Sequence, residues 1–466
     1  MAKKYLTLCL LLILSTQLKA QQYGLFNTRT MFDAFENPAQ KAFVLDSSRQ
    51  YASNFLIPYF GLNGANKGDS NYSLRTLIHG DKYDASQIPI GTGKRNKLYE
   101  NSNIYLLTFR IFQSYKYNKE LGFSWQMRSD AFANYSNETL VLFDDYNRFD
   151  KNATGLFNGN GSGQSYHQFS VNYRENYNKR LAFGAKLSLL SGITYNKIDI
   201  TNSSLTIDPI AQDLRIGLAG TYKASFLRAS ELSGSTILPN FKNPGLSVGL
   251  GTTYLAKSGV FIMGSIKDLG FIHWSNNSQV INANETIIVN QTNHPDDQNN
   301  FEKDLDKQLT DKAQSKGFYS PTNAKADFLI SKRFGLYTPN FIISKYLFNN
   351  GGDIALSNSF KYNNYSVTLS PTYNLNGFAM LGTQGMYQTP NFEFFLGTDN
   401  LLRSAAIRQK ASQTTGYTGA SVYMGMAIKF GYVVEHPQNS SYMPGVGDDN
   451  ETSFLSKILG IFKKKK

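Results

Sequence analysis

The sequence predicts an all-β protein, a transmembrane antiparallel β-barrel of roughly 14 strands with a short N-terminal helical hatch or plug and a C-terminal amphipathic helical tail. Three observations predict this fold. The chain of 466 residues is 14% aromatic and contains 38 Gly, yet after its N-terminus it has no apolar run long enough for a membrane helix. Several long segments alternate apolar and polar residues. Short polar turns alternate with long connections, as in outer-membrane barrels, whose long loops face outward.

Residues 1–20, "MAKKYLTLCLLLILSTQLKA", have the three parts of a secretory signal peptide: a basic start, an apolar core and a small-residue site, with cleavage predicted near Ala20. A single-pass anchor is the alternative, but the apolar run is too short to span a bilayer comfortably. Cys9, the only cysteine, lies in this segment, so the mature chain is expected to fold without disulfides. The expected location is the cell outer membrane.

Residues 21–50 are predicted to form the hatch or plug. In "FENPAQKAF", Asn37 suits the N-cap of a helix, Pro38 suits the first helical position, and Ala39 to Leu45 can continue the helix. Between a signal peptide and a barrel, such a helix is expected inside the lumen at the periplasmic side, where it fills the opening. A moving gate is the further hypothesis for the same segment.

Residues 51–434 are predicted to form the barrel. In "LAFGAKLSLLSGITYNK" (181–197), Leu187 and Leu189 fall on the lipid side, and Lys186 and Ser188 on the lumen side. "YSVTLSPTYNL" (365–375) and "SVYMGMAIKFGY" (421–432) alternate in the same way. A soluble exported sandwich or solenoid has strands of about five or six residues, and several strands here are about twice that length. Long loops are expected at 137–164, 226–244, 275–317 and 403–416, and the alternation is unclear from 198 to 226.

The alternation also predicts which charged side chains face the lumen. Five basic residues and three acidic residues that could pair with them fall on that face: Arg110, Arg128, Arg174, Lys186, Lys429, Asp268, Glu393 and Asp399. A buried charge must find a partner or water. We therefore favour an internal network of charge pairs that fills the barrel, with an ion-selective channel as the alternative.

One predicted strand changes phase in "IKDLGFIHW". Ile262 and Ile266 face one way, but after Asp268 the apolar residues are Leu269 and Phe271. A change of phase next to Gly270 predicts a bulge or kink in the strand. The segment Asp268, Leu269 and Gly270 is then either a gate or only an adjustment of strand twist.

Signals for catalysis are weak, so enzyme activity is not expected. "GLSVG" at 245–249 matches Gly-x-Ser-x-Gly, but it lies inside an alternating strand rather than at a strand-to-helix turn. The five histidines include no His-x-x-x-His pair, and no cysteine-containing zinc motif remains once Cys9 is removed. No cofactor or metal is expected. Part of the net charge of +13 is the terminal "KKKK", so the charge does not predict nucleic-acid binding.

Residues 435–466 are predicted to be a periplasmic linker followed by the basic amphipathic tail "SFLSKILGIFKKKK". This tail could lie on an anionic leaflet, dock a periplasmic partner or fray. The partners expected for the whole chain are outer-membrane lipid and either a hydrophobic small-molecule ligand or a protein of secretion or surface assembly.

Two pieces of the chain resemble known families. "NPA" at 37–39, between a signal peptide and a barrel, resembles the hatch motif of FadL-type (OMPP1/FadL/TodX-type) transporters. Residues 241–274, together with "SVNYRENYNKRLAFGAKLSLLSG" and "NFEFFLGTDNLL", resemble a related outer-membrane barrel family known only as a domain of unknown function. PorV, a secretion-linked barrel, is a more distant relative.

The two resemblances imply different functions, of which the channel is the expected one and the scaffold the alternative. The FadL resemblance implies a channel for hydrophobic small molecules, which are captured outside and released sideways through a gap between strands. The PorV resemblance implies a plugged barrel that is a scaffold or partner in protein secretion and surface assembly. An apolar tunnel ending at an opening in the wall would favour the channel, and a lumen filled by paired Arg, Lys and carboxylates would count against it.

Overall fold

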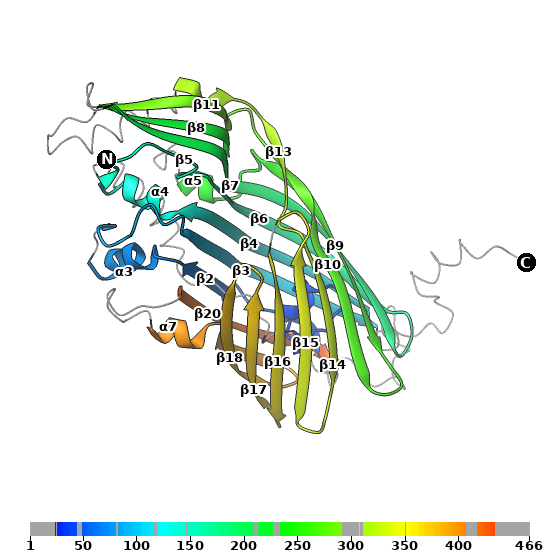
Figure 1. Ribbon diagram of the computed structural model, residues 1–466. Helices are drawn as coiled ribbons and strands as arrows, with labels where there is room; N and C mark the ends of the chain where they lie inside the picture. The colour runs from blue at the N-terminus through cyan, green and yellow to red at the C-terminus, as the bar shows by residue number, and fades with distance from the viewer. Residues whose placement is uncertain are drawn as a thin grey trace, which may run out of the picture.

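The computed structural model describes residues 24, 26–43, 49–80, 83–114, 119–145, 148–208, 213–226, 234–290, 307, 311–349, 351–406 and 417–433. They form a closed 14-stranded antiparallel β-barrel (Figure 1). In this described part of the chain, no helix is long and apolar enough to cross a membrane. The predicted signal peptide and C-terminal tail lie outside the described residues.

The first strand of the wall is in two pieces. Both β1 (Arg49–Ser53) and β2 (Tyr59–Lys67) pair with β3 (Arg95–Ser114) on one side and with β20 (Tyr417–Val433) on the other, which closes the barrel. From β3 the wall continues in chain order through β4 (Lys119–Ser136), β6 (Gly159–Asn176), β7 (Leu181–Asp208), β9 (Pro244–Leu255), β10 (Val260–Trp274), β13 (Phe318–Pro321) with β14 (Lys325–Lys332), β15 (Tyr337–Tyr346), β16 (Gly352–Tyr362), β17 (Tyr365–Asn374), β18 (Phe378–Gln388) and β19 (Phe392–Thr398).

One side of the barrel extends beyond the wall. The second half of β7 pairs with β8 (Asp213–Ala224), which pairs with β11 (Gln279–Asn290), while the first half of β7 pairs with β9. Figure 1 shows β8 and β11 projecting past the shorter strands β14 to β18. The short strands β5 (Ala153–Thr154) and β12 (Gln314–Ser315) border this extension. Residues 275–317 were expected to be a loop, and β11 corrects that expectation.

Short helices lie in the connections at the same end of the barrel. They are α3 (Asn71–Gly80), α4 (Asn137–Leu142), α5 (Gly234–Ile237) and α7 (Leu401–Ala406). The side chains of α4 and its neighbours pack on the extension: Val141 and Phe149 share an apolar cluster with Leu205 of β7 and Ile216 of β8. The projecting sheet is therefore covered on one face by the chain's own loops.

The predicted alternation of lipid and lumen faces is confirmed. Leu187 and Leu189 of β7 are exposed on the outside, whereas Lys186 and Ser188 are buried. The alternation changes phase further along β7, because the register of the β6–β7 pair shifts where Ile193 has no partner in β6. This bulge explains why the sequence pattern was unclear after residue 198.

The predicted N-terminal helix is present, but its position was wrong. The helix α2 (Asp33–Glu36) ends before Pro38, and Asn37 is its C-cap, with extended φ and ψ of −120° and 108°. An extended residue before proline can either precede a helix as its N-cap or follow a helix at its end. Here the helix ends, because the Asn37 amide donates to the Asp33 carbonyl at 2.9 Å. Its Oδ1 instead accepts a hydrogen bond of 3.0 Å from the Ala39 amide, forming a turn.

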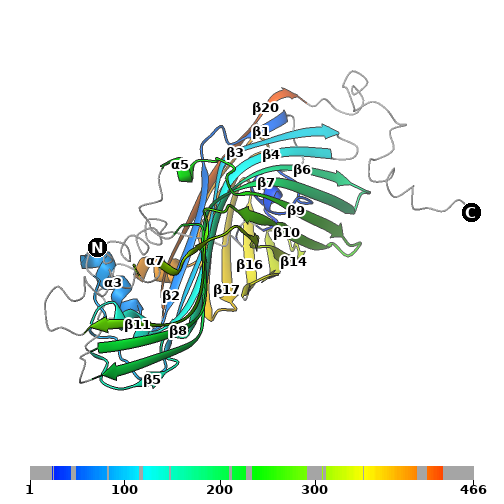
Figure 2. The same ribbon diagram turned by 90° about the horizontal axis from the view of Figure 1, so that it is seen from above.

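This N-terminal segment lies inside the ring of strands, drawn in blue in both views (Figure 2). Its apolar side chains enter a buried aromatic cluster with the wall. Phe32 stacks on Tyr59 at 4.7 Å between ring centroids and contacts Tyr105 at 5.6 Å and Phe395 at 5.8 Å. The core of this barrel is therefore the N-terminal segment packed against the inner face of the wall.

Candidate functional site in the barrel lumen

The turn at Asn37, Pro38 and Ala39 rests on two glycines of the wall. A Cβ atom on Gly184 of β7 would lie 2.1 Å from the Pro38 carbonyl, and one on Gly251 of β9 would lie 2.3 Å from Asn37 Oδ1. Because these neighbours include backbone atoms, a side chain at Gly184 could not be accommodated without moving the turn. Because neither glycine has a side chain, the turn packs directly against the backbone of β7 and β9.

A first ion-pair network holds this turn and the helix before it. Arg110 of β3 and Arg174 of β6 both pair with Glu120 of β4, at 2.5 and 3.5 Å. Each arginine also donates to a backbone carbonyl of the N-terminal segment, Arg110 to Ala34 at 3.2 Å and Arg174 to Ala39 at 2.8 Å. The two guanidinium groups therefore join three wall strands to the segment in the lumen.

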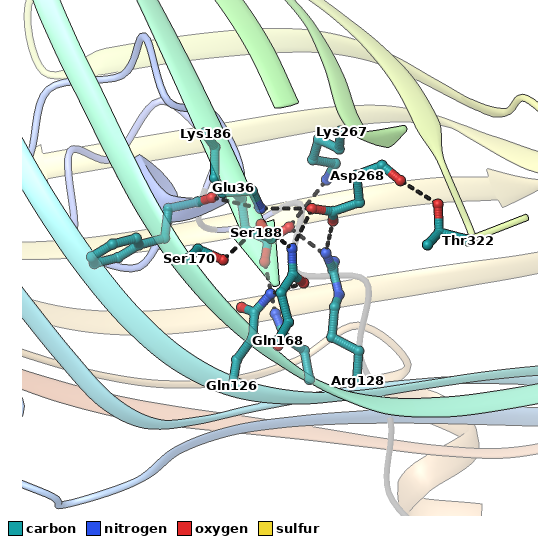
Figure 3. A network of polar contacts seen from close by, with 12 residues as sticks. Glu36, Gln126, Arg128, Gln168, Ser170, Lys186, Ser188, Lys267, Asp268 and Thr322 are labelled. Atoms are coloured by element: carbon teal, nitrogen blue, oxygen red, sulfur yellow. Dashed lines mark hydrogen bonds and ion pairs between the residues drawn. The ribbon is translucent and has the colours of Figure 1, made fainter. Parts of the chain in front are cut away.

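A second network centres on Asp268 of β10 (Figure 3). Arg128 of β4 pairs with its Oδ2, and Lys186 of β7 pairs with its Oδ1 at 2.8 Å. Gln168 of β6 donates to the same Oδ1 at 2.7 Å and to Ser188 at 2.9 Å. All of these side chains are buried, so the single carboxylate of Asp268 pairs with two cations within the lumen.

Glu36, the last residue of α2, continues the second network. Its carboxylate contacts Arg128 at 3.2 Å and Lys267 at 3.3 Å, and it accepts a hydrogen bond of 2.7 Å from the Tyr105 hydroxyl. Lys267 also pairs with Asp327 of β14 at 3.0 Å. Burial would raise the pKa of the Glu36 carboxyl, but the nearby Arg128 and lysine cations hold that pKa well below its usual range.

The remaining three residues predicted to face the lumen are buried outside these networks. Glu393 accepts a hydrogen bond of 2.8 Å from the Met31 amide. The ammonium group of Lys429 lies over the rings of Phe112 and Phe43, at 4.3 and 5.0 Å. Asp399 lies apart, and its Oδ2 has no hydrogen-bond partner in the described part of the chain. Two of the three therefore contact the N-terminal segment.

Four charged residues of the networks were missed by the sequence reasoning: Glu36, Glu120, Lys267 and Asp327. Glu120 and Arg128 lie eight positions apart on the same strand, so both point to the same face. The alternation that placed Arg128 in the lumen could therefore have placed Glu120 there too. Lys267 could not have been found in this way, because it and its neighbour Asp268 both point inward.

The irregularity predicted at Asp268 to Gly270 is present in the wall. The register between β9 and β10 shifts between Ile266 and Leu269, and Asp268 has a left-handed φ of 52°. On the other side of β10, Thr322 bridges the interval between β13 and β14: its hydroxyl donates to the Asp268 carbonyl, and its amide donates to the Gly270 carbonyl at 3.0 Å. A Cβ atom at Gly270 would lie 2.0 Å from a backbone oxygen of β9. The wall is bent here but remains hydrogen-bonded.

The described part of the chain has no group of three or more His, Cys, Asp or Glu side chains that could hold a metal ion. The charged groups of the lumen instead neutralise one another. Taken together, the closed wall, its apolar outer face and its filled lumen define an outer-membrane β-barrel with an N-terminal segment held inside.

The chain belongs to the family described as "Family of unknown function (DUF5723)", whose model matches residues 48–399. No curated protein sequence matches it significantly. Among solved structures it is similar to the Pseudomonas putida toluene transporter TodX, with 9% identity, a TM-score of 0.41, and coverage of 88% of this chain and 98% of that one. It is also similar to the Ralstonia pickettii toluene transporter TbuX, with 10% identity, a TM-score of 0.40 and coverage of 86% and 94%.

A third similar structure is the translocator domain of the autotransporter NalP from Neisseria meningitidis. The identity is 6% and the TM-score 0.35, with coverage of 83% of this chain and 90% of that one. The resemblance to an uncharacterised barrel family is confirmed by the family match, and the TodX and TbuX structures are FadL-type channels to which this chain is similar. The more distant resemblance to PorV stays a prediction.

Proposed function

We propose that this protein is a sealed outer-membrane barrel that acts as a scaffold or partner in protein secretion and surface assembly. The observation that carries the proposal is the way the N-terminal segment is held. Side chains from six wall strands, β3, β4, β6, β7, β10 and β19, contact its backbone or the carboxylate of Glu36. A gate that moves readily would not be tied to so many strands.

Electrostatics support a fixed plug over a moving gate. If the segment left the lumen, Arg128 and Lys267 would lose Glu36, and Arg110 and Arg174 would lose the carbonyls of Ala34 and Ala39. Removing one partner of a buried ion pair costs about 3–5 kcal/mol, because the remaining charge is left uncompensated. Each of the four cations would keep a carboxylate of the wall, so the cost would be a part of this value for each lost contact with Glu36, together with the two lost hydrogen bonds.

The second candidate is a channel for hydrophobic small molecules, and the bend at Asp268 favours it. The bend lies in the wall, with Leu269 exposed toward the lipid. Passage at this point would have to displace the Arg128, Lys186 and Gln168 side chains gathered on Asp268. A polar barrier of this kind is a poor path for an apolar ligand, which is why the channel ranks second.

The seal is tested by conductance of the full-length protein in planar bilayers. We expect no ion conductance above background from the wild type. The variant Glu36→Lys places a third cation beside Arg128 and Lys267, so it should loosen the plug and produce discrete conductance steps. Asp150→Lys, at an exposed loop position, makes the same change of charge away from the lumen and should stay silent. Open wild-type channels would contradict the sealed barrel.

Uptake of radiolabelled laurate separates the two candidates. Cells with and without the protein should take up laurate at the same rate if the barrel is sealed. Faster uptake in cells that make the protein, abolished by a cross-link between the plug and the wall, would overturn the scaffold and favour the channel.

The scaffold itself is tested by photo-cross-linking in cells. A photoreactive residue at Thr221, exposed on the projecting strand β8, should give discrete adducts with exported proteins. The same residue at the lipid-facing Leu187 is the control. The same exported proteins should be missing from the surface of cells that lack the barrel, and an unchanged set of surface proteins would count against a scaffold.

A further inference from the structure

A polar cavity opens at the end of the barrel from which β8 and β11 project. Its volume is about 230 Å³. The long strands β3, β4, β6 and β7 line one side of it, and the last residue of β15 and the β17–β18 turn line the other. None of its lining residues belongs to the hatch or to the two ion-pair networks. The cavity is therefore separate from the site in the lumen.

The inner end of the cavity is built from buried side chains and its mouth from exposed ones. Tyr99, Asp130 and Tyr346 are buried, whereas Asn160 and Asn349 are exposed. Ligand cavities for drug-sized molecules have volumes of about 300–1,000 Å³. This smaller cavity suits a single small polar unit, or the end unit of a longer molecule that extends outward through the mouth.

Contacts between β3 and the far wall border the cavity. Lys97 of β3 donates to the carbonyl of Asn376 in the β17–β18 turn at 3.3 Å. The ammonium group of Lys325 lies 4.5 Å from the ring centroid of Tyr346. The two sides of the cavity are therefore joined by direct contacts at its edge.

Charges of both signs surround the cavity. Three carboxylates line it, Glu100, Asp130 and Asp199, with Lys197 as the lining cation. Lys97 and Lys325 lie close to the lining, and the carboxylate of Asp353 lies near Lys325 in turn. Cations and carboxylates are thus interspersed, with no cluster of cations that would select an anion, and the many polar groups would be left unpaired by a hydrocarbon.

The uncharged part of the lining consists mainly of amides and aromatic rings. Asn160, Asn323, Asn349 and Asn376 supply donors and acceptors together, and Phe132 and Phe348 supply ring surfaces. Planar amide and carboxylate groups can each bind a pair of neighbouring hydroxyls, and aromatic rings pack on the C–H faces of a sugar ring. This combination of groups matches the alternating polar and apolar surfaces of a pyranose.

We propose that this cavity binds a neutral saccharide, as a free sugar or as the terminal unit of a glycan. The proposal goes beyond the scaffold function and does not rest on it, because none of the residues that line the cavity belongs to the N-terminal segment or to the two ion-pair networks. Asn160 and Asn349 at the mouth are the residues expected to select hydroxyl groups.

The test is saturation-transfer NMR on the full-length protein in a detergent without a sugar headgroup. The probes are the methyl glycosides of glucose, galactose, mannose and N-acetylglucosamine at about 10 mM, a concentration that detects dissociation constants near 1 mM. Putrescine serves as the cationic comparison and laurate as the apolar one. At least one glycoside should give a saturable signal, and putrescine and laurate should give weaker ones.

The matched variants are Asn160→Leu with Asn349→Leu, both at the mouth, and Asn277→Leu, at an exposed position away from the cavity. The double variant should weaken glycoside binding at least about tenfold, and Asn277→Leu should leave it unchanged. The proposal is overturned if no glycoside gives a signal, if the double variant binds as well as the wild type, or if putrescine binds more tightly and depends on the same two residues. Conductance is read separately, so a failure here leaves the sealed barrel untouched.

Discussion

The wall of the barrel is interrupted at two places, one closed by charged side chains and the other by an amide and apolar packing. One is the bend of β10 at Asp268, where buried charges gather on the lumen side. The other lies between β1 and β2, where the chain leaves the wall from Asn54 to Pro58. Comparing them shows how a single N-terminal segment can support two weak points in one wall.

The break between β1 and β2 pushes apolar residues toward the lipid. Ser53 pairs with Phe109 of β3 and Tyr59 pairs with Tyr105, so five residues (54–58) stand opposite three (106–108). The surplus bulges outward and exposes Phe55, Leu56 and Ile57 by 50%, 65% and 44%. Two of these three, Phe55 and Leu56, have left-handed φ values of 48° and 61°.

The side chain of Asn54 closes this break in the backbone ladder. Its Oδ1 accepts from the Thr108 amide at 2.8 Å, and its Nδ2 donates to the carbonyls of Ile57 and Leu106 at 2.8 and 3.2 Å. Behind it, on the lumen side, lies the aromatic cluster of Phe32 and Tyr59. At this break an amide replaces the lost backbone hydrogen bonds, and apolar packing excludes water.

The difference follows from the two sides of the N-terminal segment. Phe32 turns toward β2, and Glu36 turns toward β4 and β10. Each weak point is therefore closed by the side of the segment that faces it, through apolar contact at one and charge at the other. Variants at the two breaks should then differ in size of effect and in kind.

The largest effect is expected from Asp268→Asn. Asparagine tolerates the left-handed φ of this position, so the change removes the charge with little cost to the backbone. Lys186 would lose its carboxylate partner and Arg128 would keep only Glu36, which should lower the free energy of unfolding by about 3–5 kcal/mol. Guanidinium unfolding in detergent micelles measures this difference.

The control for that change is Asp150→Asn at an exposed loop position, which should alter the free energy of unfolding by no more than about 0.5 kcal/mol. A loss below about 1 kcal/mol for Asp268→Asn would mean that water already compensates the two cations. In that case the bend of β10 would be a wet opening, and the contrast with the break at Asn54 would disappear.

A smaller effect is expected from Asn54→Ala. The change leaves the Thr108 amide and the Leu106 carbonyl without partners, at a cost of about 1–3 kcal/mol. Hydrogen exchange at the Thr108 amide should become faster in this variant and stay unchanged in Asp268→Asn. Equal exchange in both variants would show that the two breaks open together and are not separate weak points.

The fold could be predicted from the sequence because alternate residues of a barrel strand face the lipid and the lumen, and the two sets differ in polarity. The same alternation placed Arg110, Arg128, Arg174 and Lys186 on one face, and the structure buries all four. The phase change at Asp268 was visible in the sequence as well, because apolar residues lie on both sides of it. The alternation failed beyond Ile193, where an added residue reverses the phase of β7, and a reversal is hard to distinguish from a mistake in counting.

The lumen site could be predicted only in part, because contacts with the N-terminal segment depend on the whole barrel. Asn37 and Pro38 were read as a helix start, but an extended residue before proline also follows a helix end, and the local sequence does not distinguish the two. Glu36 was overlooked for the same reason, since it was assigned to the residues before the helix. Its partners Arg128 and Lys267 are 92 and 231 residues away in the chain, so local patterns carry no sign of them.

The smallest effect is expected at the lipid-facing tip of the break, from Leu56→Ala. Leu56 is exposed to the membrane, and alanine remains apolar, so the free energy of unfolding should fall by about 1 kcal/mol or less. Leu187→Ala is the matched control, because Leu187 is 61% exposed on the regular strand β7. Equal losses would mean that residues 55–57 only touch lipid and that Asn54 alone closes the break. A clearly larger loss at Leu56 would assign part of the closure to the bulge itself, and the break would then be held from both sides of the wall.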